Sequence, residues 1–216
     1  MALIDLSHPV AHGTITYPGL PAPVITDYLS REDSKGRYAP DTTFHIARID
    51  MVANTGTYID APSHRYAEGD DISRLRLEQV ANVDAIVIDT RGIRKIVPAV
   101  FRSHDVTGRA VLFLTRWSRY FGTSEYGNGR NPFVTREGAE ALVEAKAALV
   151  GIDSMNIDDP ADGARPAHTI LLRANIPIVE HLTNLDQVPA HGSRFFAIPA
   201  RFVGVGSFPV RAFVLT

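Results

Sequence analysis

The sequence predicts a mixed α/β fold, and two observations lead to this prediction. Apolar runs of strand length are frequent, and those at 83–90 and 109–117 are continuous, which is typical of strands covered on both faces. Helical periodicity is clear only at 134–147 and is short at 168–175, so helices alternate with strands only in the middle of the chain. Strands therefore outnumber helices, which favours a mixed sheet over a doubly wound one.

In the N-terminal half, residues 2–7 alternate apolar and polar side chains and predict a strand. Residues 8–23 are rich in Pro and Gly and predict a loop. A β-branched segment, 42–54, alternates over its middle and predicts a second strand. The runs 83–90 and 109–117 complete the predicted strands of this half.

The C-terminal half contains the clearest helix, 134–147, with Thr135 as a plausible N-cap and Glu137 in the first turn. Four further strands are predicted, and a short helix at 168–175 follows a polar loop. These strands are 147–153, 176–182, 194–202 and 209–215, the last two joined through 203–208. The tract 119–132 is predicted to be a polar surface loop, and a subunit contact is one role open to it.

The bulk composition indicates a single domain spanning 1–216. The apolar fraction of 45% allows a sizeable core, and a formal net charge of −2 with scattered Lys and Arg argues against nucleic-acid binding. The absence of cysteine excludes a disulfide scaffold and a thiolate site. Neither a signal peptide nor an apolar run of ~18 residues is visible, so we expect a soluble, cytoplasmic protein with no membrane partner.

Common catalytic motifs are missing. There is no G-x-S-x-G elbow, no phosphate-binding P-loop and no H-E-x-x-H helix. The G-x-G at 204–206 lacks a third glycine and is interpreted as a hinge between strands.

The segment 54–64, NTGTYIDAPSH, places Asp60 and His64 four residues apart. Pro62 lies between them, so they do not share a regular helix face, but an extended loop can turn both side chains into one cavity. Asp and His together suit either a divalent metal or an acid–base pair. A capping Asp with a surface His is the alternative that these two residues leave open.

A second group of residues favours the metal. His168 opens a helical run, and Glu180 lies in an apolar strand, where a carboxylate requires a partner or solvent. Asp60, His168 and Glu180 have the composition of a hydrolytic zinc or manganese site. His181 competes with Glu180, because neighbouring strand residues face opposite sides.

NTGTYIDAPSH resembles the signature H-x-G-T-H-x-D-x-P-x-H of the cyclase or kynurenine formamidase-like family of metal-dependent hydrolases, which includes isatin hydrolases. The resemblance runs almost end to end, through DLSHPV, YPG, VGIDSMNIDDP, IVEHLTNLDQVP and FPVRAFVLT. It implies a mixed, partly closed sheet with flanking helices, the swivelling β/β/α-type cyclase fold. It also implies a homo-oligomer, at least a dimer. The apolar loop 14–24 is a second reason to expect one, because apolar side chains are costly to leave in water.

The resemblance implies a role for several residues of the site. Asp60 matches an aspartate that bridges two metals, His168 a ligand of the second metal, and Glu180 a carboxylate that touches both. His64 matches the histidine that donates and accepts the proton, and Tyr17 lies where kynurenine formamidases carry a substrate-contacting Trp. An aromatic residue that packs against a partner subunit is the equal alternative for Tyr17.

Two positions depart from the signature. Asn54 and Tyr58 replace histidines that bind the first metal, so one divalent ion is expected, bound by Asp60, His168 and Glu180. The Tyr58 hydroxyl is a candidate oxyanion donor, with a pocket-filling aromatic as the alternative. Asp153 and Ser154 are candidates for orienting the site, although a solvated turn is an equal interpretation.

The leading hypothesis is a hydrolase that cleaves an amide, cyclic amide or lactone-type bond of a small molecule, with His64 as acid and base. A metal-free descendant that only binds a small molecule or partner is the second hypothesis, favoured by Asn54 and Tyr58. An enzyme without metal, using Asp60 and His64 as a dyad, is the third.

Overall fold

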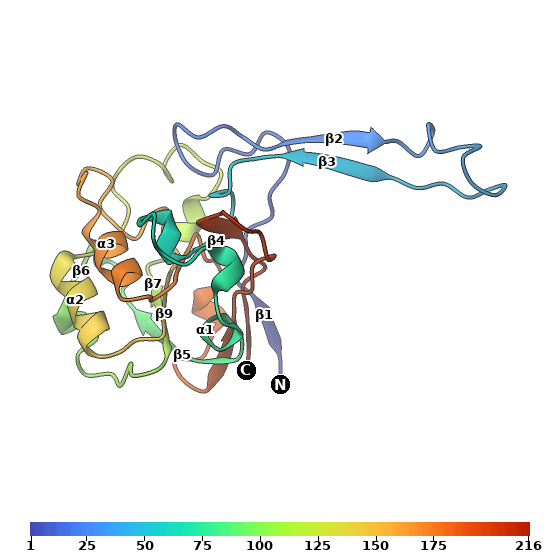
Figure 1. Ribbon diagram of the computed structural model, residues 1–216. Coiled ribbons are helices and arrows are strands. Elements are labelled where there is room, and N and C mark those ends of the chain that lie inside the picture. The colour runs from blue at the N-terminus through green and yellow to red at the C-terminus, as the bar shows by residue number, and fades with distance from the viewer.

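A nine-stranded mixed sheet forms the centre of the computed structural model, which describes residues 1–216 (Figure 1). Its strands, in spatial order, are β1 (Leu3–Asp5), β13 (Phe213–Leu215), β11 (Ser193–Phe196), β5 (Val83–Asp89), β7 (Ala110–Leu114), β9 (Leu149–Ile152), β10 (Ile178–Glu180), β4 (Tyr58–Asp60) and β12 (Ser207–Pro209).

Four adjacent strands in the middle of this sheet, β5, β7, β9 and β10, are parallel, and the strands on either side of them pair antiparallel. The large sheet curls, and few helices pack against it, which confirms the predicted mixed α/β fold. Parallel strands need crossover connections, and the helices α2 (Arg136–Glu144) and α3 (Pro166–Arg173) supply two of them.

Both faces of the central strands are buried. Ile86 and Ile88 of β5 face a cluster that includes residues of α2 and α3, whereas Ala85 and Val87 face the opposite cluster. The cluster on the side of Ala85 and Val87 contains Val80, from the short helix α1 (Leu77–Val80), together with loop residues and residues of β4, β11 and β13. Alternating burial on both faces explains why these strands read as continuous apolar runs.

The predicted helix 134–147 is α2, and its start is capped as expected. The Thr135 hydroxyl accepts a hydrogen bond of 3.1 Å from the backbone N–H of Gly138, and Glu137 lies in the first turn. Ala139 and Leu142 face the core. The short helix predicted to begin at His168 begins at Pro166, a residue that the first helical position tolerates well.

The largest departure from prediction is an arm that leaves the body of the molecule (Figure 1). The expected strand 42–54 is shortened to β3 (Ile46–Asp50), which pairs only with β2 (Val24–Leu29), a strand that was not predicted. All five residues of β3 are exposed. The alternation of apolar and polar residues predicted the strand correctly. It cannot show that the apolar side chains of this strand stay exposed within one chain.

Two corrections concern the C-terminal region. The strand predicted over 194–202 is β11 and ends at Phe196, and the connector predicted over 203–208 contains the start of edge strand β12. β12 is an edge strand of only three residues, so local sequence gives little signal for it.

A small second sheet and several short helices complete the fold. A two-stranded parallel sheet joins β6 (Lys95–Ile96) to β8 (Phe133–Val134). Single-turn 3₁₀ helices occupy Pro62–His64, Ile72–Arg74, Pro98–Val100, Trp117–Tyr120 and Leu185–Gln187. No helix has both the length and the apolar character needed to cross a membrane.

Candidate metal centre

The register of three strands assembles one wall of the site. β4 and β10 pair so that Tyr58 lies opposite Glu180 and Asp60 lies opposite Ile178, and on the other side of β4 Ser207 lies opposite Asp60. Because side chains two residues apart share a face, Tyr58, Asp60, Glu180 and Ser207 all project from the same face of the sheet. Ile178 packs in the cluster that contains α3, so this is the face that α3 covers.

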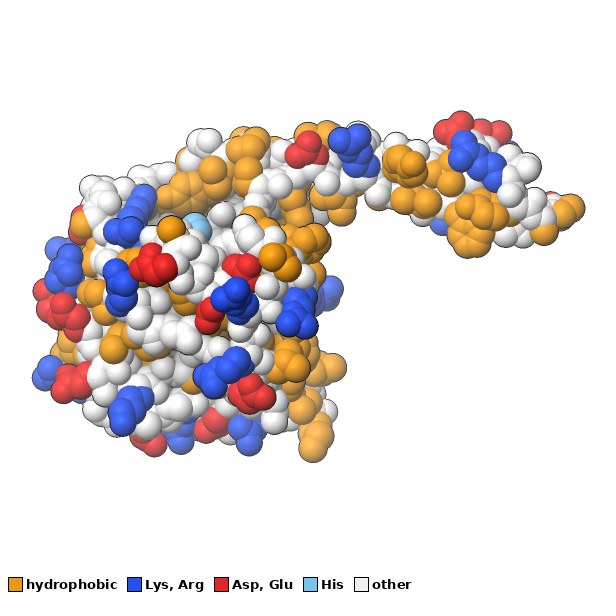
Figure 2. Space-filling model, in the orientation of Figure 1, with side chains coloured by type: hydrophobic (Ala, Val, Ile, Leu, Met, Phe, Trp, Pro, Cys, Tyr) orange, Lys and Arg blue, Asp and Glu red, His pale blue; other side chains and the backbone are white.

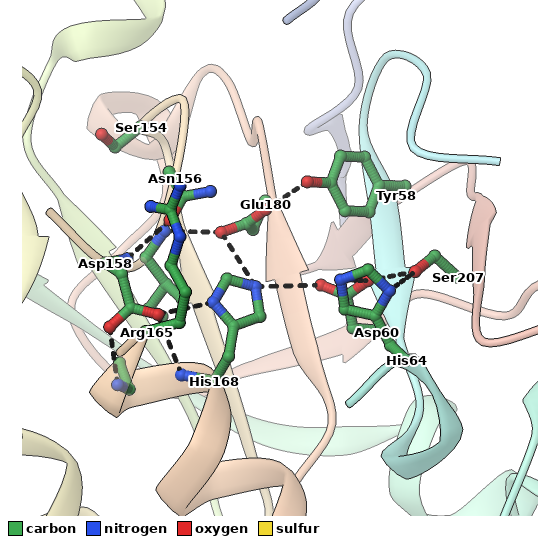
Figure 3. A network of polar contacts seen from close by, with 12 residues as sticks. Tyr58, Asp60, His64, Ser154, Asn156, Asp158, Arg165, His168, Glu180 and Ser207 are labelled. Carbon is green, nitrogen blue, oxygen red and sulfur yellow. Dashed lines mark hydrogen bonds and ion pairs between the residues drawn. The ribbon is translucent and has the colours of Figure 1, made fainter. Parts of the chain in front are cut away.

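Asp60 and Glu180 converge on one imidazole nitrogen (Figure 3). His168 Nε2, from the first turn of α3, lies 3.6 Å from Asp60 Oδ2 and 3.7 Å from Glu180 Oε1. Both carboxyl side chains are fully buried, and Asp60 Oδ2 has no hydrogen-bond partner. A buried carboxylate oxygen without a partner is costly, so the cluster is incomplete without a cation.

Asp158 fixes the orientation of His168. Its carboxylate accepts hydrogen bonds from the backbone N–H of Ala167 at 2.6 Å and of His168 at 3.1 Å. It also contacts His168 Nδ1 at 2.6 Å. Nδ1 therefore donates to Asp158, which leaves Nε2, the nitrogen nearest Asp60 and Glu180, as the one that would bind a metal ion.

Burial and charge compete in the pKa values of this cluster. Burial alone would raise the pKa of Asp60, but contacts with His168, His64 and Ser207 lower it below its usual value. Burial and the charge of Asp60 raise the pKa of Glu180 to about 7, partly opposed by His168. Burial would lower the pKa of His168, but Glu180, Asp158 and Asp60 raise it to about 10. The protein thus gathers negative charge around one cationic position.

His64 stands at the solvent side of the cluster. It ends the 3₁₀ helix Pro62–His64, and its side chain is 35% exposed. Its Nε2 lies 3.9 Å from Asp60 Oδ1, and its Nδ1 lies 2.9 Å from the Ser207 hydroxyl, which donates to Asp60 Oδ1. Pro62 begins this helix and so sets the turn that brings His64 back towards Asp60.

Tyr58, one of the two residues that depart from the family signature, lies beside Glu180, and Asn54 lies near Tyr58. The Tyr58 hydroxyl donates a hydrogen bond to Glu180 Oε2, while Glu180 Oε1 accepts from the backbone N–H of Ile157. Burial, with the charges of Glu180 and Asp60, raises the pKa of Tyr58 well above its usual value, although Asn54 opposes this. Tyr58 is therefore a neutral donor to Glu180, and its role towards an oxyanion stays a prediction.

A cavity of about 290 Å³ opens onto the cluster. Its size suits a small molecule. Tyr17, the residue predicted to contact substrate, lies in its wall. The residues that line it are Tyr17, Leu20, Asn54, Tyr58, His64, Arg65, Asn156, Arg165 and His168.

Of the two competing residues, Glu180 on β10 joins the cluster and His181, the next residue, does not. His181, just after the strand, has a positive φ of 57°, and its Nδ1 contacts the hydroxyl of Tyr126 at 2.9 Å. Tyr126 is 3% exposed, which corrects the prediction that 119–132 is only a polar surface loop.

Asp153 and Ser154 do not orient the cluster, and they are not a solvated turn either. Both are buried. Asp153 accepts hydrogen bonds from Thr115 and from the backbone N–H of Arg116, and Ser154 donates to the carbonyl of Pro132. The residue that sequence reasoning missed is Asp158, which lies further along the same loop between β9 and α3. One sequence signal could have identified Asp158: it is an acidic residue in the loop before the predicted helix that begins with the candidate ligand His168.

The donor set fits a divalent cation. One ligand atom each from Asp60, His64 and His168 lies within 4.8 Å of the others, and Glu180 adjoins them through His168. Carboxylate and imidazole ligands suit zinc and manganese.

Comparison with known proteins places the chain in a family. The family model described as "Putative cyclase" matches residues 4–159, so the chain belongs to this family. A kynurenine formamidase from Salinibacter ruber is 28% identical over 213 residues, covering 98% of this chain and 96% of the relative. A kynurenine formamidase from Bacillus cereus is 26% identical, with the same coverage of each chain.

Solved structures agree. Isatin hydrolase A from Ralstonia solanacearum superposes with a TM-score of 0.84 at 23% identity, covering 99% of this chain and 91% of its own, which shows the fold. A structure described as a potential metal-dependent hydrolase with cyclase activity has a TM-score of 0.80 at 26% identity, covering 99% and 96%. The predicted family and hydrolase class are confirmed, and the metal-dependent neighbour, with the donor set above, supports a metal cofactor.

The geometry at His168 leads to a prediction about Asp158. The variant Asp158→Asn should weaken divalent metal binding by roughly 10–100-fold, because the amide no longer holds the Nδ1–H tautomer as firmly. Titration with zinc in a competing chelator measures this. Asp162→Asn is the matched control, since exposed Asp162 also accepts a backbone hydrogen bond but lies away from the cluster. Equal zinc affinity in both variants would contradict the role of Asp158.

Proposed function

We propose that this chain is a metal-dependent hydrolase that cleaves an amide, cyclic amide or lactone-type bond of a small molecule. The observation that carries the proposal is the convergence of buried Asp60 and Glu180 on His168 Nε2, beside a cavity of about 290 Å³. The relatives named as kynurenine formamidases support the C–N bond as the target.

Asp60, His168 and Glu180 would hold one divalent ion, zinc or manganese. Such an ion, when bound, lowers the pKa of water and polarises a carbonyl group. The chain supplies the rest of the chemistry. His64, partly exposed beside Asp60 and lining the cavity, accepts a proton and returns it to the leaving nitrogen or oxygen. Tyr17 and Leu20 form an apolar wall that positions the substrate.

The first prediction is a metal content near one ion per chain. At the two signature positions, Asn54 offers a neutral amide and Tyr58 a phenol whose pKa is raised by burial. The Tyr58 hydroxyl also donates a hydrogen bond to Glu180. Neither is a good ligand in that state. Elemental analysis after purification without chelators measures the content.

The converse variant sharpens this test. Asn54→His combined with Tyr58→His should bring the content towards two ions, while Tyr58→Phe, which only removes the hydroxyl, should leave it near one. Two ions in the unaltered protein contradict the single-ion site. No metal with full activity favours the Asp60–His64 dyad, and no metal with no activity favours the binding protein.

The second prediction separates catalysis from metal binding at His64. His64→Asn should keep the metal content and reduce turnover by roughly 10²–10⁴, the range for a lost general acid–base. The substrate for this assay is the best of a panel of formamides, cyclic imides and lactones. If the variant loses its metal instead, His64 is a ligand, as its distance to Asp60 allows.

The third prediction concerns assembly. We infer that the arm packs against a second copy of the chain, because two-stranded sheets are marginally stable alone and this one exposes apolar side chains along its length (Figure 2). Those side chains include Ile25, Tyr28, Phe44, Ile46 and Ile49, of which Tyr28 is 75% exposed. Each copy would bury the arm of its partner, so the smallest assembly is a dimer.

Light scattering at micromolar concentration tests this inference. The protein should be a dimer or larger, and the double variant Tyr28→Asp with Ile49→Asp should shift it to monomer. Ile93→Asp, which removes an exposed apolar residue from the body, is the control and should not. A monomeric unaltered protein contradicts the arm as an interface.

A further inference from the structure

The segment GVGSF, residues 204–208, packs against the turn that carries His64. The sequence predicts only a glycine-hinged connection here, but the segment contains the start of the edge strand β12, which pairs with β4. At the start of the turn, the backbone N–H of Ala61 donates a hydrogen bond of 2.8 Å to the carbonyl of Gly206. The segment therefore supports the turn that ends at His64, a role that the proposed chemistry does not assign to it.

Position 206 has room only for a glycine. A Cβ on Gly206 would lie 2.6 Å from the backbone N of His64, 2.7 Å from its Cα and 3.1 Å from the carbonyl carbon of Ser63. All three are backbone atoms, so no side-chain rotation relieves the contact. Gly206 does not have a positive φ, so the glycine is needed for the close approach and not for an unusual backbone conformation. This approach brings the next side chain, Ser207, beside the imidazole of His64 (Figure 3).

The Ser207 hydroxyl has two polar neighbours and a single proton. Its Oγ donates a hydrogen bond to Asp60 Oδ1 and lies 2.9 Å from His64 Nδ1. A carboxylate that binds a metal ion is unprotonated and can only accept hydrogen bonds. The proton of Ser207 is therefore used by Asp60, and the contact with His64 requires a proton on Nδ1. The lone pair of neutral His64 then lies on Nε2.

This tautomer suits a group that accepts and returns a proton. His64 lines the cavity, and its Nε2 lies 3.9 Å from Asp60 Oδ1. When Nε2 accepts a proton, the Nδ1–H bond to Ser207 is kept, and the Asp60 carboxylate stabilises the positive charge through the hydroxyl. Ser207 itself is 2% exposed and does not line the cavity, so its hydroxyl is not placed to attack a substrate.

Resting on the proposed function, we propose that Gly206 and Ser207 are positioning residues for the proton transfer by His64. Gly206 lets the edge strand approach the turn, and Ser207 holds the imidazole as the Nδ1–H tautomer with Nε2 free. The proton of the attacking water passes to Nε2 and from there to the leaving nitrogen or oxygen. The protons on Nδ1 and on Ser207 stay in place throughout.

The variant Ser207→Ala removes the acceptor for Nδ1–H. In the zinc-loaded protein, with the best substrate of the panel, it should lower kcat by roughly 10–100-fold with little change in KM, because the hydroxyl orients a reacting group and does not touch substrate. Ser207→Thr keeps the hydroxyl and should restore most of kcat. Ser193→Ala is the matched control and should change nothing, since Ser193 is also buried on a strand but its hydroxyl has no partner.

Gly206→Ala tests the close approach independently. It should displace His64 and lower kcat, whereas Gly163→Ala, whose added Cβ would meet nothing within 4 Å, should not. Elemental analysis should find the metal content unchanged in the Ser207 and Gly206 variants. Loss of metal in Ser207→Ala would mean that the hydroxyl serves Asp60 and not His64, and full kcat in Gly206→Ala would mean that the close approach is not needed. Either result overturns the proposal.

Nitrogen NMR of zinc-loaded protein labelled at its histidines separates failure of this proposal from failure of the proposed function. The His64 signals are those lost in His64→Asn, and neutral His64 should show a protonated Nδ1 and a free Nε2. Ser207→Ala should convert this to a mixture of tautomers, and Ser193→Ala should not.

The combined results decide between the two proposals. If no substrate of the panel is hydrolysed but the tautomer change is found, the hydrolase assignment fails and the positioning role of Ser207 stands. If a substrate is hydrolysed and Ser207→Ala alters neither kcat nor the tautomer, the positioning role is wrong and the hydrolase stands. Absence of both hydrolysis and the tautomer change overturns both.

Discussion

Two carboxylates buried against one imidazole nitrogen are the constraint on which this structure depends. Asp60 and Glu180 are both fully buried, and each approaches His168 Nε2 within 4 Å. Like charges held this close in a low-dielectric environment repel strongly unless a cation lies among them. The fold must therefore be stable enough elsewhere to hold them, and the two apolar clusters on either face of the central strands provide that stability.

The pairing register of β4 and β10 brings the two carboxylates to the same site. A shift of one residue between β4 and β10 would turn Asp60 away from Glu180, because successive side chains face opposite sides of a sheet. Ile59 and Val179, the intervening residues, are fully buried in the opposite apolar cluster and oppose any such shift. The hydrophobic pattern of two short strands thus fixes the position of the two acids. Asp158 does the same for His168 from the side of α3.

The sequence predicted those parts of the molecule that depend on local pattern. The buried strands β5 and β7 and the capped helix α2 follow from apolar runs and from Thr135. The grouping of Asp60 with His168 and Glu180 was suggested by their residue types and strengthened by the family signature, although more than a hundred residues separate Asp60 from His168. Asp153 and Asp158 lie in the same loop between β9 and α3, and only tertiary contacts show which of them reaches His168. The arm and β12 were missed or shortened for the same reason, since their pairing partners define them.

The charges around the cluster explain why a neutral Tyr58 can stand at a position where the signature has a histidine. With one divalent ion, the charges of Asp60 and Glu180 would be balanced, while the Asp158 carboxylate is held by His168 and two backbone N–H groups. A second divalent ion would add two more positive charges beside His64, which also lies next to Asp60. The neutral Tyr58 hydroxyl satisfies Glu180 Oε2 with a proton instead of an ion. Replacing the histidines of the signature with Asn54 and Tyr58 therefore suits a cluster whose two bridging carboxylates need only one divalent ion.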